Sequence, residues 1–519
     1  MQMLDLKQIT LTGELAFRLG RNFSRLEDPM YRVPEIFHAD QQGWPGDWEG
    51  RTILALCQHE QISSRKAAFL DDVLETLDTR WNEKGYLGEI YPESVINEQQ
   101  LAGHNWLLRS LMELYCCRHE ESYAKRATCI VENLFLPLLG RFSSYPSEPE
   151  KRVLKGEAAG HIAGNTLNGW MLSTDIGCAF ISLDALTQYY CLFGGEQIRM
   201  LVFEMMEAFA RIDVEKCSLQ THATLSALRG VLRFCETESN ESIQAFAEKC
   251  FDHYIKYGMT ANYANYNWFG RPYWTEPCAV VDSYMAAMAL FRMTKRREYA
   301  SLANRIYYNA LLAAQRPNGG FGCDKCSGTE ESGEFLLAES NVYEAWWCCS
   351  MRGAEGLCSA AANCILVEND QIWFINYLPG KFHSNGLEIT VKTPYPDVNE
   401  VRISLCGITT RKTLRFYLPD GAENVECCIN GQVFCTKEAG FLTITIESDT
   451  TLLLSFQLSA HQEQAIGCAT VKGARVTMLG DQVLGTWEND QSIILAKRFY
   501  TERVKNSGIK MLNLRGTPR

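Results

Sequence analysis

The chain has 519 residues, of which 46% are hydrophobic and 22% charged, so it is an ordinary folded protein rather than a disordered, collagen-like or small disulfide-rich chain. At about 150 residues per domain, this length predicts two to four domains. Lysine and arginine number 50 and aspartate and glutamate 62, which gives a net charge of −12. A chain this acidic is a poor general binder of nucleic acid or anionic membrane, and we expect neither as a partner.

The N-terminal segment has no basic stretch followed by an apolar core, and no window approaches 18 uninterrupted apolar residues. We therefore expect neither a signal peptide nor a membrane span. The 21 cysteines favour a cytoplasmic protein with reduced thiols, most of them small buried hydrophobic residues. Only the cysteines that cluster are therefore informative about function.

Apolar residues recur with helical spacing as far as residue 363, as in Phe69, Val73 and Leu77. This pattern predicts about eleven helices, mostly in adjacent pairs, over residues 51–61, 64–81, 98–117, 120–139, 174–193, 196–212, 219–236, 240–257, 278–294, 297–315 and 345–361. Paired helices in one compact unit predict an α/α toroid over residues 1–362. We expect a functional site at its mouth, where the connecting loops gather.

After residue 363 the apolar pattern shortens to alternating or continuous runs separated by Gly, Asn, Asp and Pro, which is typical of strands and turns. The expected strands include residues 371–378, 387–392, 400–405, 442–448 and 451–458, with further ones around 467–480 and 492–499. We therefore predict a mainly α, multidomain chain with a β-sandwich over residues 363–519.

The adjacent pair Cys348 and Cys349 is the sharpest local feature. Neighbouring cysteines rarely pair with each other, but both can reach one metal ion, and helical spacing resumes just after them, where a helix N-terminus favours thiolates. Glu276 and Cys278 stand two residues apart at the start of an apolar helix. Together these four side chains suit tetrahedral zinc. The alternative is that the cysteines are buried structural thiols.

A competing set is Cys323-x-x-Cys326, whose glycine-rich setting is typical of a zinc knuckle. With Cys348 and Cys349 it also supplies four sulfurs. Two further interpretations are a redox site and a pair of unpaired thiols.

The chain resembles glycoside hydrolase family 127, the β-L-arabinofuranosidase family, over roughly residues 5–480. The segments that carry the resemblance are ITLTGELAFRLGRN, GYLGEIY, NEQQLAGHNWLL, THATLSALRGVL, TEPCA, WWCCSMRG and WFINYLP followed by LEITVKTPYP. The Glu-x-Cys and Cys-Cys elements, about 70 residues apart, are specific as a pair, whereas the other segments are weak markers.

The resemblance implies an (α/α)6 barrel followed by β-sandwich material and a zinc ion, Zn2+, held by Glu276, Cys278, Cys348 and Cys349. It implies that Cys348 is the nucleophile of a retaining glycosidase that acts on a furanosidic, arabinose-like sugar. His104 and His222 match histidines that line the family's sugar pocket, and we predict that both bind substrate. A small carbohydrate is then the expected ligand, and a homo-oligomer remains open.

Aromatic residues gather just before the expected ligand Glu276. Flat aromatic faces with polar tips suit sugar rings, so we predict that Tyr263, Tyr266 and Trp268 contact substrate. The alternative is a loop packed on the rim of the barrel.

The chain departs from the family at the acid/base residue, a glutamate some sixteen residues before the zinc-binding one. Thr260 stands at that position, and residues 261–275 contain no Asp or Glu. The remaining candidates for the proton donor are Glu98, Asp175, Tyr263 and Tyr266. Alternatives are a non-catalytic carbohydrate-binding relative with a structural zinc, or another zinc–thiolate reaction on a sugar.

Overall fold

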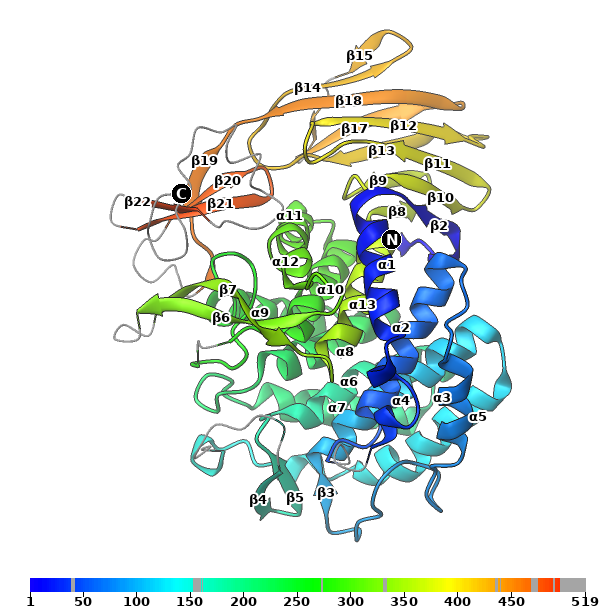
Figure 1. The fold of residues 1–519 in the computed structure, drawn as a ribbon, viewed down its shortest axis with the longest axis vertical. Helices are drawn as coiled ribbons and strands as arrows, with labels where there is room; N and C mark the ends of the chain where they lie inside the picture. Colours follow the sequence, from blue (N-terminus) through cyan, green and yellow to red (C-terminus); the bar gives the residue numbers. More distant parts are fainter. Residues whose placement is uncertain are drawn as a thin grey trace.

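A computed structural model describes residues 1–38, 43–152, 160, 162–271, 274–329, 334–434, 437–438, 440–467, 475–488 and 491–494. Figure 1 shows a helical body with β-sheets stacked on one end of it. Part of the expected strand at 492–499 lies outside the described residues.

Within the described residues, six helices form a closed inner ring in which each contacts the next and the last contacts the first. They are α2 (Asp47–Ser63), α4 (Glu98–Arg118), α6 (Leu183–Phe193), α8 (Thr221–Thr237), α10 (Pro277–Thr294) and α13 (Cys349–Asn363). An outer layer packs against them: α1 (Gly13–Leu26), α3 (Leu70–Asp78), α5 (Glu121–Ile130), α7 (Glu196–Ala210), α9 (Glu241–Tyr257) and α11 (Arg297–Ile306). The predicted helical toroid is therefore confirmed.

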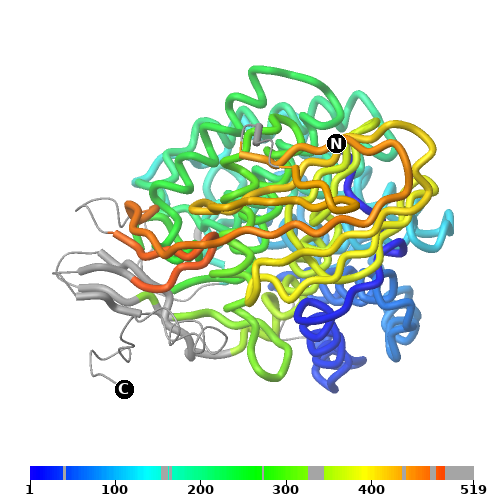
Figure 2. Tube along the Cα trace, turned by 90° about the horizontal axis from the view of Figure 1, so that it is seen from above, coloured from blue at the N-terminus to red at the C-terminus, as the bar shows by residue number. Residues whose placement is uncertain are grey.

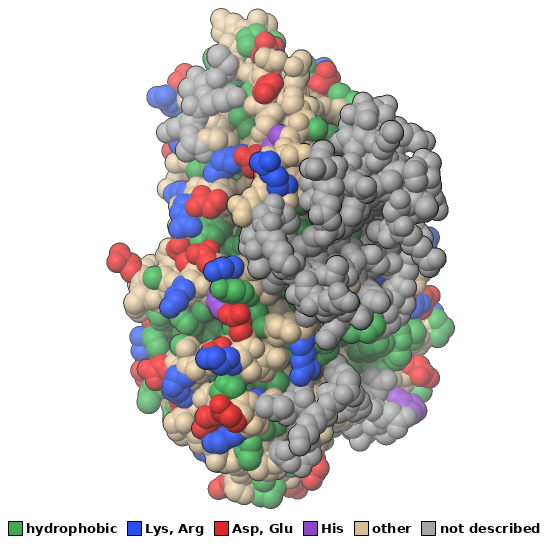
Figure 3. Space-filling model, turned by 90° about the vertical axis from the view of Figure 1, so that its left-hand side faces the viewer, with side chains coloured by type: hydrophobic (Ala, Val, Ile, Leu, Met, Phe, Trp, Pro, Cys, Tyr) green, Lys and Arg blue, Asp and Glu red, His purple; other side chains and the backbone are tan. Residues whose placement is uncertain are grey.

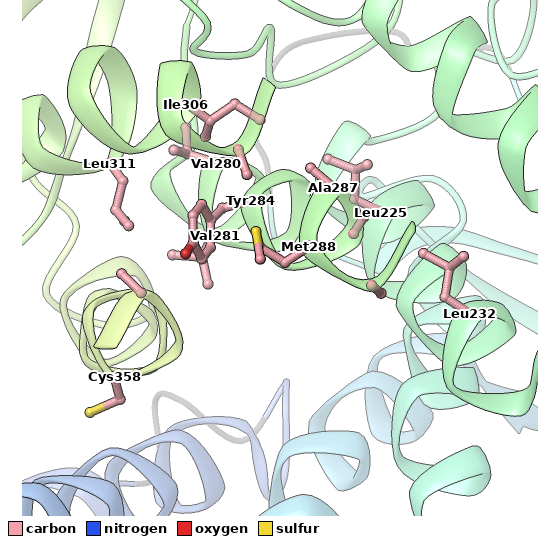
Figure 4. Close-up of a cluster of buried hydrophobic side chains, with 14 of the residues drawn as sticks. Leu225, Leu232, Val280, Val281, Tyr284, Ala287, Met288, Ile306, Leu311 and Cys358 are labelled. Atoms are coloured by element: carbon pink, nitrogen blue, oxygen red, sulfur yellow. The ribbon is translucent and has the colours of Figure 1, made fainter. Parts of the chain in front are cut away.

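Helix α10 shows why the inner helices are apolar on nearly every side. It contacts α8, α11 and α13, so its side chains meet protein in several directions. Figure 4 shows the resulting core, in which Val281, Tyr284 and Met288 of α10 lie between Leu225 of α8 and Leu311, which follows α11. A helix surrounded in this way keeps apolar residues all round, whereas an outer helix keeps a single stripe.

Three expectations about helices differ from the structure, and one is the helix expected over 174–193, of which Leu183–Phe193 is α-helical. Helix α1 is not among the expected helices, although it buries a stripe formed by Leu15, Leu19 and Phe23. The helix expected over 64–81 spans only Leu70–Asp78, because α2 ends at Ser63 and Ser64 adopts a left-handed backbone conformation with φ of 54°. This conformation is unfavourable for a continuing right-handed helix.

Two large sheets form the β-sandwich material and lie across the helical ring in Figure 2. The seven-stranded sheet has the order β15 (Gln432–Phe434), β14 (Ala422–Ile429), β18 (Thr450–Leu458), β12 (Glu400–Cys406), β11 (Leu387–Lys392), β10 (Gly380–Ser384), β2 (Ile9–Leu11). The six-stranded sheet has the order β1 (Gln2–Met3), β8 (Ile365–Glu368), β9 (Gln371–Phe374), β13 (Lys412–Tyr417), β17 (Phe441–Ile446), β16 (Lys437–Glu438).

Both sheets include a strand from the N-terminus, which the expected division at residue 363 does not foresee. Ile9 to Leu11 pair with β10, and Gln2 and Met3 pair with β8. Segments of two or three residues are too short to show an alternating pattern, so their pairing depends on the sheets that receive them.

Smaller sheets surround the helical ring. One has the order β19 (His461–Gln464), β20 (Arg475–Leu479), β21 (Gln482–Glu488), β22 (Gln491–Ile494), and another β3 (Ile96–Asn97), β5 (Trp170–Ser173), β4 (Ile162–Leu167). Strands β6 (Gly322–Thr329) and β7 (Glu334–Glu344) form a hairpin that leads into α13.

Figure 3 shows one face of the molecule, on which acidic and basic side chains are interspersed over the described surface. Such mixing keeps either sign from producing a large local field. Every helix in the described part of the chain is too short or too polar to cross a lipid bilayer.

Candidate active site

The four expected metal ligands meet at one point of the ring. The donor atoms of Glu276, Cys278, Cys348 and Cys349 all lie within 4.8 Å of one another. The Sγ atom of Cys349 is 3.5 Å from that of Cys278 and 3.3 Å from that of Cys348. Cys278 and Cys349 are fully buried, whereas Cys348 is partly exposed. Cys348 is therefore the least enclosed of the three cysteines.

These ligands stand at the starts of two inner helices. Glu276 caps the N-terminus of α10, where Pro277 occupies the first turn, and Cys348 caps the N-terminus of α13. A helix N-terminus carries unpaired N–H groups and a partial positive charge. Both offset part of the cost of burying a carboxylate or a thiolate at these positions.

The donor set fits a divalent cation. Tetrahedral zinc, with Zn–S distances of about 2.3 Å, places its sulfur ligands about 3.8 Å apart, close to the separations observed here. Burial raises the pKa of the Glu276 carboxyl and the Cys278 thiol well above their ordinary values. Charging these buried acids requires a compensating positive charge, which a bound cation supplies.

A buried arginine adds positive charge to the cluster. Arg51 of α2 donates a hydrogen bond from Nη1 to Cys278 Sγ over 3.6 Å, and its guanidinium stacks 4.0 Å from the ring centre of Trp106. Asp47 accepts from Arg51 Nε at 2.6 Å and fixes the side chain from the other side. Arg51 therefore favours the thiolate of Cys278.

The Glu276 side chain is held from the neighbouring helix. Gln220, just before α8, donates from Nε2 to Glu276 Oε2 over 3.2 Å. Asn265 Oδ1 accepts the Glu276 backbone N–H at 3.2 Å. These contacts orient the carboxylate in the way that outer partners of a metal ligand generally do.

The competing Cys323-x-x-Cys326 motif lies in strand β6 of a hairpin rather than in a knuckle loop. Cys326 packs against Tyr266 and is not one of the four residues of the ligand group. Burial raises the pKa of the Cys349 thiol and Cys323 adds to that shift, which places Cys323 near Cys349. The two cysteines of the motif therefore have different surroundings.

His222 is placed for hydrogen bonding to a ligand. Its Nδ1 lies 2.8 Å from Asp282 Oδ2, and its ring stacks on Trp106 at 5.8 Å. Its Nε2 is buried and has no hydrogen-bond partner among the described residues. Burial lowers the pKa of His222, so the neutral ring donates from Nδ1 to Asp282 and leaves Nε2 as an acceptor.

Asp282 is held in turn by a network of buried charges. Arg229 donates to Asp282 at 2.7 Å, and Arg352 and Ser226 also donate to it. Although burial alone would raise it, Arg352 and Arg229 hold the pKa of Asp282 well below its ordinary value. The anionic form persists and keeps His222 in one tautomer.

His104 has both ring nitrogens engaged within the protein. Its Nδ1 lies 2.8 Å from the Gln100 carbonyl, and its Nε2 accepts the backbone N–H of Leu87 at 2.9 Å. The residue is fully buried. In this arrangement His104 ties the loop before β3 to helix α4.

The three expected aromatic contacts lie in different surroundings. The Tyr263 hydroxyl contacts Arg305 at 2.6 Å and Glu463 at 3.3 Å, which directs it toward β19. Tyr266 packs against Cys326. Trp268 forms a backbone bridge with Gln220 and has a buried Nε1 without a hydrogen-bond partner among the described residues. The backbone of Trp268 therefore adjoins Gln220, which contacts Glu276.

The structure separates the two carboxyl candidates for a proton donor. Glu98 accepts from Tyr145 at 2.6 Å, from the Ser173 N–H at 2.7 Å and from Arg152 at both oxygens. Each of the two carboxylate oxygens thus accepts from two donors within the protein.

The Asp175 carboxyl is less fully hydrogen-bonded than that of Glu98. It is 8% exposed, and its Oδ1 is buried without a hydrogen-bond partner among the described residues. Burial raises the pKa of Asp175 to about 6, aided by the charges of Asp47 and Glu98. It interacts electrostatically with Glu276, and its neighbour Ile176 accepts the Gln220 N–H at 3.1 Å. Asp175 therefore lies next to the residue that bonds to Gln220, a contact of Glu276, and its carboxyl takes up a proton near pH 6.

Several site residues are not anticipated by the sequence analysis, namely Arg51, Trp106, Gln220 and Asp282. The available signal is a polar side chain inside an apolar helix, as with Asp282 in PCAVVDSYMAAMALF and Arg51 before TILALC. A buried charge is costly unless it is paired. Such a position therefore indicates a partner, but the sequence does not say which one.

Comparisons with known proteins agree with this geometry. Residues 220–362 match the sequence model of the β-L-arabinofuranosidase GH127 catalytic domain, a range that includes all four expected ligands. No curated protein matches the chain. The resemblance to this family expected from the sequence is confirmed.

Solved structures show the same fold. A GH127 β-arabinofuranosidase superposes with a TM-score of 0.68 at 14% identity, covering 93% of this chain and 84% of its own. A GH127 β-L-arabinofuranosidase from Geobacillus stearothermophilus T6 gives a TM-score of 0.64 at 13% identity, covering 92% and 86%. A further structure described as a glycoside hydrolase gives 0.65 at 13% identity, covering 93% and 83%. The (α/α)6 barrel with its β-sandwich is thus shared along nearly the whole chain.

Proposed function

From the glycoside hydrolase family 127 catalytic domain at residues 220–362, we propose that this chain is a retaining glycosidase for β-L-arabinofuranosides or closely related furanosides. The observation that carries the proposal is the convergence of Glu276, Cys278, Cys348 and Cys349 within the matched region. We propose that these four residues hold zinc. A zinc ion bound there would keep the sulfurs as thiolates at neutral pH.

Cys348 is the proposed nucleophile because it is the ligand at the surface of the cluster, while Cys278 and Cys349 are fully buried. In the first displacement its sulfur bonds to the anomeric carbon as the bond from that carbon to the leaving oxygen breaks. In the second, water attacks the same carbon and the carbon–sulfur bond breaks, with the electron pair returning to sulfur. Two displacements retain the anomeric configuration.

Asp175 is the proposed acid and base. Its carboxyl gives a proton to the leaving oxygen in the first displacement and takes one from the attacking water in the second. Burial holds its pKa at about 6, near the range in which one group can serve both steps. Because the position of the family's glutamate holds Thr260 here, Asp175 supplies the carboxylate from a different segment, between β5 and α6.

His222 and Trp268 are the proposed sugar contacts. The acceptor Nε2 of His222 suits a sugar hydroxyl, and Trp268 offers an indole N–H next to Gln220. His104 and Tyr263 are occupied by protein partners and contribute to the site through the loops they hold.

The test is release of sugar from a panel of aryl β-L-arabinofuranosides and related furanosides by the wild type and by Cys348→Ala. We expect turnover by the wild type and a loss of at least about 10³-fold in kcat for Cys348→Ala. The exposed Cys406 provides the control Cys406→Ala, which should keep full activity. Equal activity of Cys348→Ala and the wild type would rule out this nucleophile.

The alternative, a carbohydrate-binding relative with a structural zinc, is motivated by the lack of Asp and Glu in residues 261–275. It predicts sugar binding by calorimetry together with one zinc per chain and no product from any member of the panel. Release of sugar that depends on Cys348 excludes it.

A further inference from the structure

Cys323 lies at the edge of the four-ligand cluster although it belongs to neither motif that forms it. It is 9% exposed, and the strand around it joins both ligand-bearing segments, because Phe321 accepts the Ala345 N–H at 2.9 Å and Asp324 accepts the Thr275 N–H at 2.8 Å. Cys323 also adds to the raised pKa of Glu276 and of Cys349, both of which burial raises first. A fifth buried sulfur therefore stands beside the proposed ligands, outside the group whose donor atoms all lie within 4.8 Å.

The backbone fixes Cys323 in this place. The next residue, Asp324, accepts the Thr275 N–H at 2.8 Å and donates its own N–H to Thr275 Oγ1 at 2.9 Å. Arg316 donates to the Cys323 carbonyl at 2.8 Å and to Asp324 Oδ1 at 2.7 Å. Strand β6 is thus joined to Thr275, the residue before Glu276, and these hydrogen bonds fix the position of Cys323 relative to the cluster.

The proposed reaction creates a need for such a sulfur. While Cys348 carries a sugar it is a thioether, which has no negative charge and is a weaker ligand than a thiolate. The remaining donors are then Glu276, Cys278 and Cys349. If one of the four zinc ligands is also the nucleophile, a second thiol nearby can restore the fourth ligand and so keep the metal bound during the reaction.

We propose that Cys323 is a reserve ligand of the metal centre, which takes the place of Cys348 whenever that sulfur is bonded to sugar. The Cys323 thiol loses its proton to water as its sulfur becomes a ligand, and it regains a proton when Cys348 returns as a thiolate. This inference rests on the proposed zinc site, but it concerns metal binding and can be tested without turnover.

The test uses Cys348→Ala as a stand-in for the state in which the Cys348 sulfur is unavailable. Zinc content and affinity are measured by competition with a chromophoric chelator in the wild type, in Cys348→Ala, and in Cys348→Ala combined with Cys323→Ala. We expect Cys348→Ala to keep one zinc per chain with a loss of affinity below about 10-fold. Adding Cys323→Ala to Cys348→Ala should weaken zinc binding by a further factor of about 100.

Cys326 provides the matched control. It belongs to the same strand, is 1% exposed against 9% for Cys323, and packs against Tyr266. Cys348→Ala combined with Cys326→Ala should bind zinc as Cys348→Ala does. The cadmium-113 chemical shift of the cadmium-loaded protein reports how many sulfurs bind the metal. It should indicate three sulfur ligands in the wild type and in Cys348→Ala, and two in Cys348→Ala combined with Cys323→Ala.

Each outcome separates the two proposals. If the wild type binds no metal, the proposed zinc site is wrong and the reserve ligand with it. If the wild type binds zinc but Cys323→Ala changes neither the affinity of Cys348→Ala nor its cadmium shift, only the reserve ligand is overturned. Circular dichroism of each variant identifies a loss of folding, and Cys323→Ser, which keeps the size of the side chain, then repeats the comparison.

Discussion

The Arg51 guanidinium lies 3.6 Å from the Cys278 sulfur, so a buried cation from the first inner helix touches a ligand at the start of the fifth. Asp47 holds Arg51 in place at 2.6 Å. The positive charge next to the sulfur cluster thus comes from a residue more than 200 positions away in the chain.

Replacing this cation should weaken the metal centre. For Arg51→Met we expect zinc affinity to fall about 10- to 100-fold, as is usual when an outer partner of a ligand is removed. Arg51→Lys should restore part of the loss. Competition titration with a chelator measures both, and Arg65→Met is the control, because Arg65 stacks on Phe23 and pairs with Glu27 without touching a sulfur. Unchanged affinity in Arg51→Met would contradict the role.

Asp175→Asn should remove the proton donor while it stabilises the fold. We expect kcat on substrates with poor leaving groups to fall about 10²- to 10⁴-fold, with a smaller loss on aryl glycosides whose leaving group needs little protonation. The decline of wild-type activity above about pH 6 should disappear in the variant, because Asp175 has its pKa at about 6. Equal losses on both classes of substrate would argue against proton donation.

The stability of the same variant gives an independent measurement. A carboxyl whose pKa is raised from 3.8 in the unfolded chain to about 6 in the fold destabilises the protein progressively as pH rises between these values. Above pH 6 the penalty is constant, with an upper limit of about 3 kcal/mol. Denaturant unfolding of Asp175→Asn should therefore show a gain at pH 7 that vanishes below about pH 4. A gain that persists at low pH would show that the carboxyl is not the cause.

His222→Gln should weaken substrate binding by the value of one hydrogen bond. Because Nε2 of His222 is a buried acceptor without a partner among the described residues, we expect KM to rise about 10-fold with a smaller change in kcat. Steady-state kinetics measures the two separately. His383→Gln, at an exposed position of β10, is the control and should leave KM unchanged.

Asp282→Asn should destabilise the whole ring. It leaves the buried guanidiniums of Arg229 and Arg352 without their shared carboxylate, at a cost of about 3–5 kcal/mol. Because the pKa of Asp282 is lowered in the fold, its contribution is present above about pH 4 and is lost as pH falls. The difference between wild type and variant should shrink in acid.

The control for this prediction is Asp370→Asn. Asp370 pairs with Lys412 on the surface and should contribute less than about 1 kcal/mol. If the free energies of unfolding of the two variants differ by less than about 1 kcal/mol, the structural role of Asp282 is contradicted.

The helices, the strands and the expected ligands were accessible from the sequence because each depends on short-range spacing. A 3.6-residue period shows in α10 and α13, and a two-residue period shows in β12, whose Val401, Ile403 and Leu405 are buried in alternation. The Glu-x-Cys and Cys-Cys elements mark helix starts, so four donors could be named. Helix α1 was missed although its stripe is regular, and β1 and β2 are too short for any pattern.

What the amino-acid order determined is which side chains are apolar, which can bind a metal, and which stretches of the chain are helical or extended for the most part. Only the closing of six helices into a ring decided that Arg51 meets Cys278, that Asp282 orients His222, and that Cys323 lies near Cys349. The physical reason is that periodicity records which face of an element is buried. It carries no record of the partner that buries it, and a charge inside a protein acts only on the groups that packing brings within a few ångströms.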